Sequence, residues 1–262
     1  MWVNSERRGS GETLILIHGI GHRWQAWEPV IDRLAEHHRV VAIDLPGFGR
    51  SPVPEGGMPG SMLDVVGLIA RYLREEGLER PHVAGNSLGG AIALELAAAG
   101  LVSSATAFSP GGFYTEAERR RALGILNTMR ANTFIPGPVM RLGLRLPTVR
   151  RWSLVPIVEK PANLTAQRTF EDALAMRRGR GFRPVAKAAR TYSFEGSPEV
   201  PVCVAWGDKD RIFGVHQAER ARQKLPNAVH ELLRGCGHVP MSDDPDLVCS
   251  LILRTTGALK DI

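Results

Sequence analysis

One turn, Gly85-Asn86-Ser87-Leu88-Gly89, constrains the fold of this chain more than any other stretch. An apolar run at 82–84 precedes it and predicts a strand, and an Ala- and Leu-rich run at 88–99 follows and predicts a buried helix. A serine between them needs a strained backbone, and small neighbours let strand and helix pack closely. The pentapeptide also occurs by chance in loops. Its strand-turn-helix context, however, predicts a nucleophile elbow, with the Ser87 hydroxyl held beside the free N–H groups of a helix start.

Strand and helix patterns alternate through most of the chain. Apolar runs predict strands at 13–17, 39–44, 82–84, 105–108, 200–206 and 228–233. Helical spacing of apolar residues predicts helices between them, at 25–37, 61–73, 88–99, 215–225 and 244–255. Strands that are apolar throughout are typical of parallel sheets buried on both faces. The expected fold class is therefore α/β, with a mostly parallel central sheet and helices on both faces.

The segment at 112–197 interrupts this alternation. It has helical stretches broken by prolines and no convincing strand, and residues 111–198 carry 16 Lys and Arg but only 6 Asp and Glu. The whole chain has 33 and 27, which leaves 17 and 21 for the remainder. We expect residues 1–111 and 198–262 to form the core. Residues 112–197 should form a helical cap, or lid, over the carboxyl edge of the sheet, where ligands bind in open α/β folds.

Three side chains with complementary chemistry follow predicted strands: Ser87, Asp210 and His238. The carboxyl ends of parallel strands lie at one edge, so these side chains should meet there. A serine hydroxyl needs a base to become a good nucleophile, and an aspartate can orient that base by accepting its other N–H. Asp208 is the rival acid, but we expect it to shape its own turn. For His238, a surface turn is the alternative interpretation.

Acyl transfer also requires N–H donors for the developing oxyanion, and the loss of one costs about 10²–10³ in rate. The N–H of Leu88, directly after the serine, is one candidate. The N–H of Ile20, in the loop after the first parallel strand, is the other. Trp24 and Val239 are tentative pocket residues, although core packing is the other role open to Trp24.

Five stretches together resemble the α/β-hydrolase family, in its single-domain, lid-bearing branch. They are His18-Gly19-Ile20-Gly21, Asp44-Leu45-Pro46-Gly47-Phe48-Gly49-Arg50-Ser51, Gly85-Asn86-Ser87-Leu88-Gly89-Gly90, Trp206-Gly207-Asp208-Lys209-Asp210 and Gly235-Cys236-Gly237-His238-Val239-Pro240. The resemblance spans nearly the whole chain from about Thr13 and implies that Asp210 is the acid. A serine nucleophile argues against relatives that open epoxides or displace halide, which carry aspartate there. The family opens with an antiparallel pair of strands. Only about a dozen residues precede Thr13, so we expect one or both to be missing or very short.

The resemblance implies a serine hydrolase that cleaves a small-molecule carboxylic ester through an acyl-enzyme intermediate. One alternative is a hydrolase of carbon–carbon bonds in ring-fission products, since the Gly-Asn-Ser-x-Gly-Gly elbow is common there. An inward arginine from 119–121 or 177–180 would then pair with a substrate carboxylate. The loop at 20–23 and Val239 depart from that branch, which has Gly-Pro-Gly and an aromatic residue at these places. Another alternative is a receptor, because some plant members keep the three residues and bind hormones.

Composition argues against several other classes of protein. No apolar run approaches the roughly 20 residues of a membrane span, and no signal core marks the N-terminus. Three scattered cysteines suit a reducing, cytoplasmic location. The basic segment has few aromatics and no nucleic-acid motif, so no nucleic-acid partner is expected. No cofactor is implied and no metal is expected, because His18 and His22 lie on a predicted loop without a carboxylate pair. The sequence predicts no oligomeric state.

Overall fold

The structure, a computed structural model, describes residues 3–259 and contains one seven-stranded sheet in the order β1-β3-β2-β4-β5-β6-β7. Its strands are β1 (Ser5–Arg8), β2 (Thr13–Ile17), β3 (Arg39–Ile43), β4 (His82–Asn86), β5 (Ser104–Phe108), β6 (Val202–Gly207) and β7 (Val229–Leu233). The short edge strand β1 pairs antiparallel with β3, and all the other pairings are parallel. The predicted α/β class is confirmed. Of the antiparallel pair expected at the start, β1 alone is present among residues 3–12.

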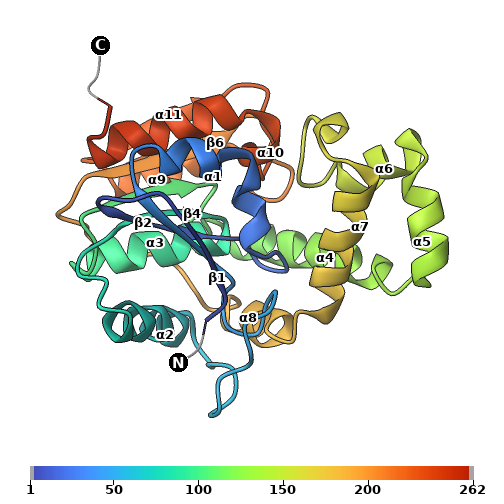
Figure 1. Ribbon diagram of the computed structural model, residues 1–262, viewed down its shortest axis with the longest axis horizontal. Helices are drawn as coiled ribbons and strands as arrows, with labels where there is room; N and C mark the ends of the chain where they lie inside the picture. The colour runs from blue at the N-terminus through green and yellow to red at the C-terminus, as the bar shows by residue number, and fades with distance from the viewer. Residues whose placement is uncertain (1–2, 260–262) are drawn as a thin grey trace.

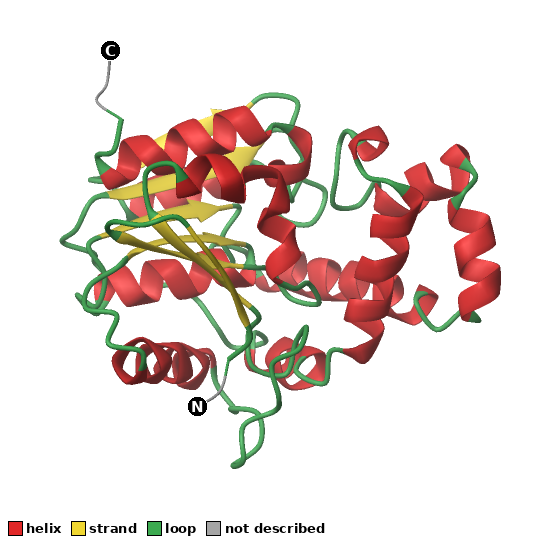
Figure 2. Cartoon of the chain, viewed as in Figure 1, coloured by secondary structure: helices red, strands yellow, loops and turns green. Residues whose placement is uncertain are grey.

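Helices cover both faces of this sheet (Figures 1 and 2). Alternate residues of each strand point to opposite faces. Leu14 and Leu16 of β2 belong to the apolar cluster beneath two of the helices, whereas Ile15 and Ile17 belong to the cluster on the other side. The first face is covered by α1 (Glu28–Ala35) and α11 (Pro245–Thr256), and the second by α2 (Met62–Glu75), α3 (Leu88–Ala98) and α9 (Gln217–Lys224). Burial on both faces is the reason that apolar residues dominate the central strands.

The connection from β4 to α3 leaves no room for a Cβ at positions 85 and 89. Ser87 has φ 57° and ψ −110°, a conformation that L residues rarely adopt. A Cβ at position 85 would lie 2.0 Å from the carbonyl oxygen of Gly89. One at position 89 would lie 2.1 Å from the carbonyl oxygen of Ile17 in β2. The two glycines therefore let α3 begin in contact with the sheet. The strained turn places Ser87 between the end of β4 and the start of α3, at the edge of the sheet.

The chain leaves the sheet between β5 and β6 and forms a separate group of helices. They are α4 (Glu116–Asn132), α5 (Gly137–Leu144), α6 (Pro147–Leu154), α7 (Ala166–Arg178) and α8 (Phe182–Ala188), with no strand at positions 109–201. Figure 1 shows α5, α6 and α7 well to one side of the sheet, with α4 reaching from the sheet toward them. Met140, Leu144 and Phe170 form a small apolar cluster of their own within this group. Within residues 3–259, no helix combines the length and the apolar character that crossing a membrane would require.

Replacing a glycine by alanine should have opposite effects where the added Cβ would meet backbone atoms and where it would meet open space. Gly89→Ala places a Cβ against backbone that cannot move away, so it should lower the free energy of unfolding by roughly 3 kcal/mol or more. The matched control is Gly67→Ala on the exposed side of α2, where nothing lies within 4 Å. It should raise the free energy of unfolding by up to about 1 kcal/mol. Urea denaturation measures both, and a Gly89→Ala protein as stable as the wild type would contradict this account.

Candidate active site

The residues predicted to react follow three strands of the sheet at their carboxyl ends. Ser87 comes directly after β4, Asp210 after β6 and His238 after β7. The Nδ1 atom of His238 lies 2.8 Å from Oδ2 of Asp210, and the two side chains are 5% and 0% exposed. A carboxylate can only accept, so Nδ1 carries the proton and Nε2 is left as the basic nitrogen. The structure thus joins a buried histidine to a buried acid at the sheet edge where the serine lies.

Asp210 is held by its own turn. Its Oδ1 accepts hydrogen bonds from the N–H groups of Ile212 and Phe213, both at 2.8 Å, which leaves Oδ2 for the histidine. Asp208 instead accepts from the N–H of Gly235 at 2.8 Å and lies 3.4 Å from the Lys209 ammonium. Asp208 therefore links its turn to the loop after β7, while Asp210 contacts the imidazole.

The loop that carries His238 is fixed beside the elbow from two sides. The Asn86 amide donates to the carbonyl oxygen of His238 at 2.8 Å, so His238 is bonded to the residue that precedes Ser87. Asp243 accepts from the N–H of Gly237 at 2.7 Å, and the Phe213 ring lies edge-on to the imidazole at 5.1 Å. Sequence reasoning missed these contacts, and only Asn86, which lies within the elbow motif, had a sequence signal.

Ser87 lines an apolar cavity with about 490 Å³ of empty space, part of it open to solvent. The cavity is lined by Ile20, Met62, Ser87, Leu88, Ala91, Gly111, Tyr114, Arg119, Ala122, Leu123, Leu126, Val185, Ala189, Tyr192 and Phe213. In the part of the chain that the structure describes, the backbone N–H groups of Ile20 and Leu88 have no hydrogen-bond acceptor. Two free donors thus adjoin the cavity that contains the serine hydroxyl.

His18 sets the direction of the peptide that carries the Ile20 N–H. Its ring is buried, Nδ1 lies 2.7 Å from the carbonyl oxygen of Gly19, and Nε2 accepts from the N–H of Leu45 at 2.9 Å. Since Nε2 accepts, Nδ1 must carry the proton and donate. The Gly19 carbonyl and the Ile20 N–H belong to one planar trans peptide and point in opposite directions. His18 was considered only as a possible metal ligand in the sequence. Its signal was its place directly before the glycines of this loop.

Asp44 braces the loops around this peptide. Its carboxylate accepts from the N–H of Trp24 at 2.7 Å, from the N–H of Arg50 at 2.8 Å and from the Asn4 amide at 2.7 Å. The Trp24 side chain is half-buried against the apolar cluster under α1 and α11, and Val239 is buried in that same cluster. Neither is among the residues that line the cavity. The cavity is built instead from the elbow, the loop at 20 and helices α4 and α8.

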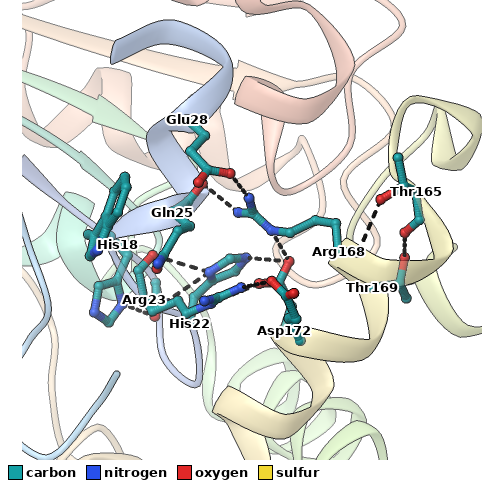
Figure 3. Close-up of polar contacts among 12 residues, drawn as sticks. His18, His22, Arg23, Gln25, Glu28, Thr165, Arg168, Thr169 and Asp172 are labelled. Carbon is teal, nitrogen blue, oxygen red and sulfur yellow. Dashed lines mark hydrogen bonds and ion pairs between the residues drawn. The ribbon is translucent and has the colours of Figure 1, made fainter. Parts of the chain in front are cut away.

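Charged side chains connect the loop after β2 to α7 (Figure 3). Asp172 lies 3.2 Å from Nε of Arg23 and 2.7 Å from Nε of Arg168, and Arg23 also reaches Glu171 at 3.1 Å. Arg168 continues to Glu28 and to the carbonyl oxygen of Gln25. Arg23, Arg168 and Asp172 are each at most one-fifth exposed, so these ion pairs are less screened than surface pairs. They join α7 to the chain segment that directly follows Ile20.

Comparisons with known proteins agree with this architecture. A sequence model described as "Alpha/beta hydrolase family" matches residues 14–251. The dihydrolipoyllysine-residue acetyltransferase component of the acetoin cleaving system of Cupriavidus necator is 29% identical over 273 residues. That match covers 97% of this chain and 66% of the relative, so the chain spans just under two-thirds of that protein's length.

Two further similarities concern an esterase and a phospholipase. The pimeloyl-[acyl-carrier protein] methyl ester esterase of Aeromonas salmonicida is 40% identical over 97 residues, which are 37% of this chain and 36% of the relative. The crystal structure of a bacterial membrane phospholipase A superposes with a TM-score of 0.75 at 25% identity, covering 98% of this chain and 82% of that one.

Burial of His18 predicts a specific pH dependence of stability. Burial lowers the pKa of His18 from 6.5 to about 4. The unfolded chain then binds the proton more readily than the folded one, so the stability from neutral His18 is fully present above pH 6.5 and is lost as the pH falls toward 4. Between pH 7 and 4.5 the wild type should lose roughly 2–3 kcal/mol more stability than His18→Gln.

Urea denaturation at the two pH values measures this difference. Ile15→Val is the matched control, since it removes a buried methyl group of β2 at a cost of about 1 kcal/mol without changing any titratable group. It should keep the pH dependence of the wild type. An equal loss in the wild type and in His18→Gln would show that His18 is not held neutral.

Proposed function

The chain belongs to the α/β-hydrolase family, and we propose that it is a serine hydrolase of carboxylic esters. The observation that carries the proposal is the buried 2.8 Å contact between His238 and Asp210. The loop that carries His238 is hydrogen-bonded to Asn86, the residue directly before Ser87. A serine in a strained turn, a neutral imidazole and a desolvated carboxylate are the groups that nucleophilic acyl transfer needs.

The proposed reaction has two chemical steps. The Ser87 oxygen attacks the ester carbonyl carbon while Nε2 of His238 takes the hydroxyl proton. Collapse of the tetrahedral intermediate breaks the bond to the alcohol, which receives that proton from His238. Water then attacks the acyl carbonyl carbon while His238 takes a proton from it. Collapse of this second tetrahedral intermediate breaks the bond to the Ser87 oxygen, which receives that proton from His238, and the acid leaves. Asp210 holds Nδ1–H throughout and stabilises the imidazolium, and it accepts no proton itself.

The free N–H groups of Ile20 and Leu88 are the proposed donors to the oxyanion. Leu88 is the first residue of α3, so the partial positive charge of a helix start adds to its N–H. His18 fixes the peptide of Ile20 in advance, and a donor that is already oriented needs no reorganisation when charge develops. The roles of the Ile20 and Leu88 N–H groups are supported by the lack of any other acceptor for them among the described residues.

Residues 112–197 are the proposed cap of this site. Four residues of this segment line the same cavity as Ser87. They are Ala122 and Leu126 of α4, Val185 of α8, and Ala189, which directly follows α8. These side chains cover the acyl chain in the proposal, and the ion pairs of α7 fasten the cap beside the loop that carries Ile20. Ester hydrolysis needs no cofactor or metal in this scheme, and a small-molecule ester is the proposed substrate.

The comparisons support ester hydrolysis. The Aeromonas relative is named as a methyl ester esterase and the phospholipase as a membrane phospholipase A, and both names describe ester hydrolysis.

We propose the cytoplasm as the location because Cys203, Cys236 and Cys249 are buried free thiols, which suit a reducing compartment.

Ser87→Ala tests the nucleophile. It should lower turnover of p-nitrophenyl esters by at least about 10⁴-fold and leave the denaturation midpoint close to that of the wild type. With the wild type, an initial burst of p-nitrophenol equal to the enzyme concentration should report the acyl-enzyme. Retained turnover in Ser87→Ala would refute the mechanism. No turnover of any ester by the wild type would favour the carbon–carbon hydrolase or the receptor.

Asp210→Asn and Asp208→Asn form a matched pair that tests the acid. The amide introduced by Asp210→Asn would present an N–H₂ group to Nδ1 and force the wrong tautomer, so kcat should fall by about 10³–10⁴-fold. The amide introduced by Asp208→Asn keeps an oxygen for the Gly235 N–H, so kcat should stay within a few-fold of the wild type. Steady-state kinetics on one p-nitrophenyl ester decide the matter, and the opposite ranking would assign the acid to Asp208.

A further inference from the structure

Within residues 3–259, Arg119 is the only charged side chain that lines the cavity around Ser87. It comes from the first turn of α4, and the other cavity residues of that helix are Ala122, Leu123 and Leu126. Spacings of three, four and seven residues place all four on one side of the helix. The otherwise apolar lining that faces Ser87 therefore includes one residue with a charged side chain.

The side chain of Arg119 forms no ion pair and no hydrogen bond in the described part of the chain, and it is half-buried. Its neighbours on α4 differ: Arg120 pairs with Glu116 at 3.5 Å, and Glu118 pairs with Arg220 of α9. A cation that is partly withdrawn from water and has no counter-ion is costly, so a site of this kind gains from an anion.

The other arginines of the inserted helices are either used or turned to solvent. Arg177 donates to the carbonyl oxygens of Thr133 and Ile135, and Arg168 is held by Asp172 and Glu28. Three more, Arg121, Arg178 and Arg180, are exposed and do not line the cavity. Of the inward arginines that the sequence left open, the structure singles out Arg119.

We propose that Arg119 selects esters whose acid portion ends in a second anionic group, a carboxylate at the far end of an aliphatic chain. This inference rests on the proposed ester hydrolysis and narrows its substrate class. The ester carbonyl would lie between Ser87 and the two free N–H groups, and the chain would run along Ala122, Leu123 and Leu126. The guanidinium fork matches a carboxylate with two parallel hydrogen bonds, which a single point charge does not. Hydrolysis of such a monoester yields a dicarboxylate and an alcohol.

Matched substrates test this selectivity. Monomethyl esters of four- to ten-carbon dicarboxylic acids are compared with methyl esters of the corresponding monocarboxylic acids by titration of the acid released. The wild type should prefer the anionic series at one chain length. Arg119→Gln should lower kcat/KM for that monoester by about 10- to 100-fold, mainly through KM. It should lower kcat/KM for the neutral ester by much less than for the anionic one. Arg119→Lys should retain part of the preference.

Arg121→Gln is the control variant, because it removes the same charge from an exposed position two residues along the helix. It should leave both substrate series unchanged. An equal loss for neutral and anionic esters in Arg119→Gln, or no loss for either, would overturn the proposal. A preference for a methyl ester ending in a phosphate over one ending in a carboxylate would overturn the assignment of the anion.

Binding measurements separate this proposal from the proposed function. Calorimetric titration of Ser87→Ala with monomethyl adipate reports affinity without turnover, and the Ser87→Ala/Arg119→Gln double variant is its comparison. Weaker binding by the double variant supports the role of Arg119 even if the wild type hydrolyses no ester. Equal affinity of the two variants overturns it even if ester hydrolysis is established.

Discussion

The close approach of β4 and α3 is the constraint on which the rest of the site depends. Gly85 and Gly89 bring the helix start against the carbonyl groups of β2 and of the turn itself, where a Cβ would lie within about 2 Å of an oxygen. Ser87 then has to adopt a positive φ, and the strain is sustained because both flanking elements are buried. The same contact places the N–H of Leu88, the first residue of α3, beside the serine. The close packing of β4 and α3 therefore positions both the hydroxyl and a hydrogen-bond donor.

Loops at the carboxyl edge are then aimed by buried polar side chains. His18, Asp44, Asn86 and Asp243 each bond to backbone groups of a neighbouring loop, at distances of 2.6–3.2 Å. Such bonds are strong in a dry interior, and leaving one partner unpaired would cost the full desolvation of the other. The candidate site is therefore positioned by residues that touch no substrate in the proposed reaction.

Some of the positive charge of the inserted helices attaches them to other segments. Arg168 and Arg177 are tied to carboxylates or carbonyl oxygens of other segments, and Arg23 of the core reaches back to α7. Arg119 differs because it lines an apolar cavity with no partner among the described residues. Most of the other basic residues of this segment are exposed, and among the described residues Arg119 is the one available to a ligand in the cavity.

Local periodicity and glycines at fixed spacing were enough to predict the elbow, the parallel sheet and most of its strands and helices in their order along the chain. The sequence also separated Asp210 from Asp208 through a motif. Three features could be seen only in the folded structure. They are the partners of Asp44, the hydrogen bonds of His18 to Gly19 and Leu45, and the residues that line the cavity. Each joins residues far apart in the chain or depends on which side of a helix faces inward. Trp24 and Val239 illustrate the limit, since their positions next to site residues in the chain did not place them on the cavity. Selecting Arg119 among neighbouring arginines likewise required knowing how α4 is rotated against the core.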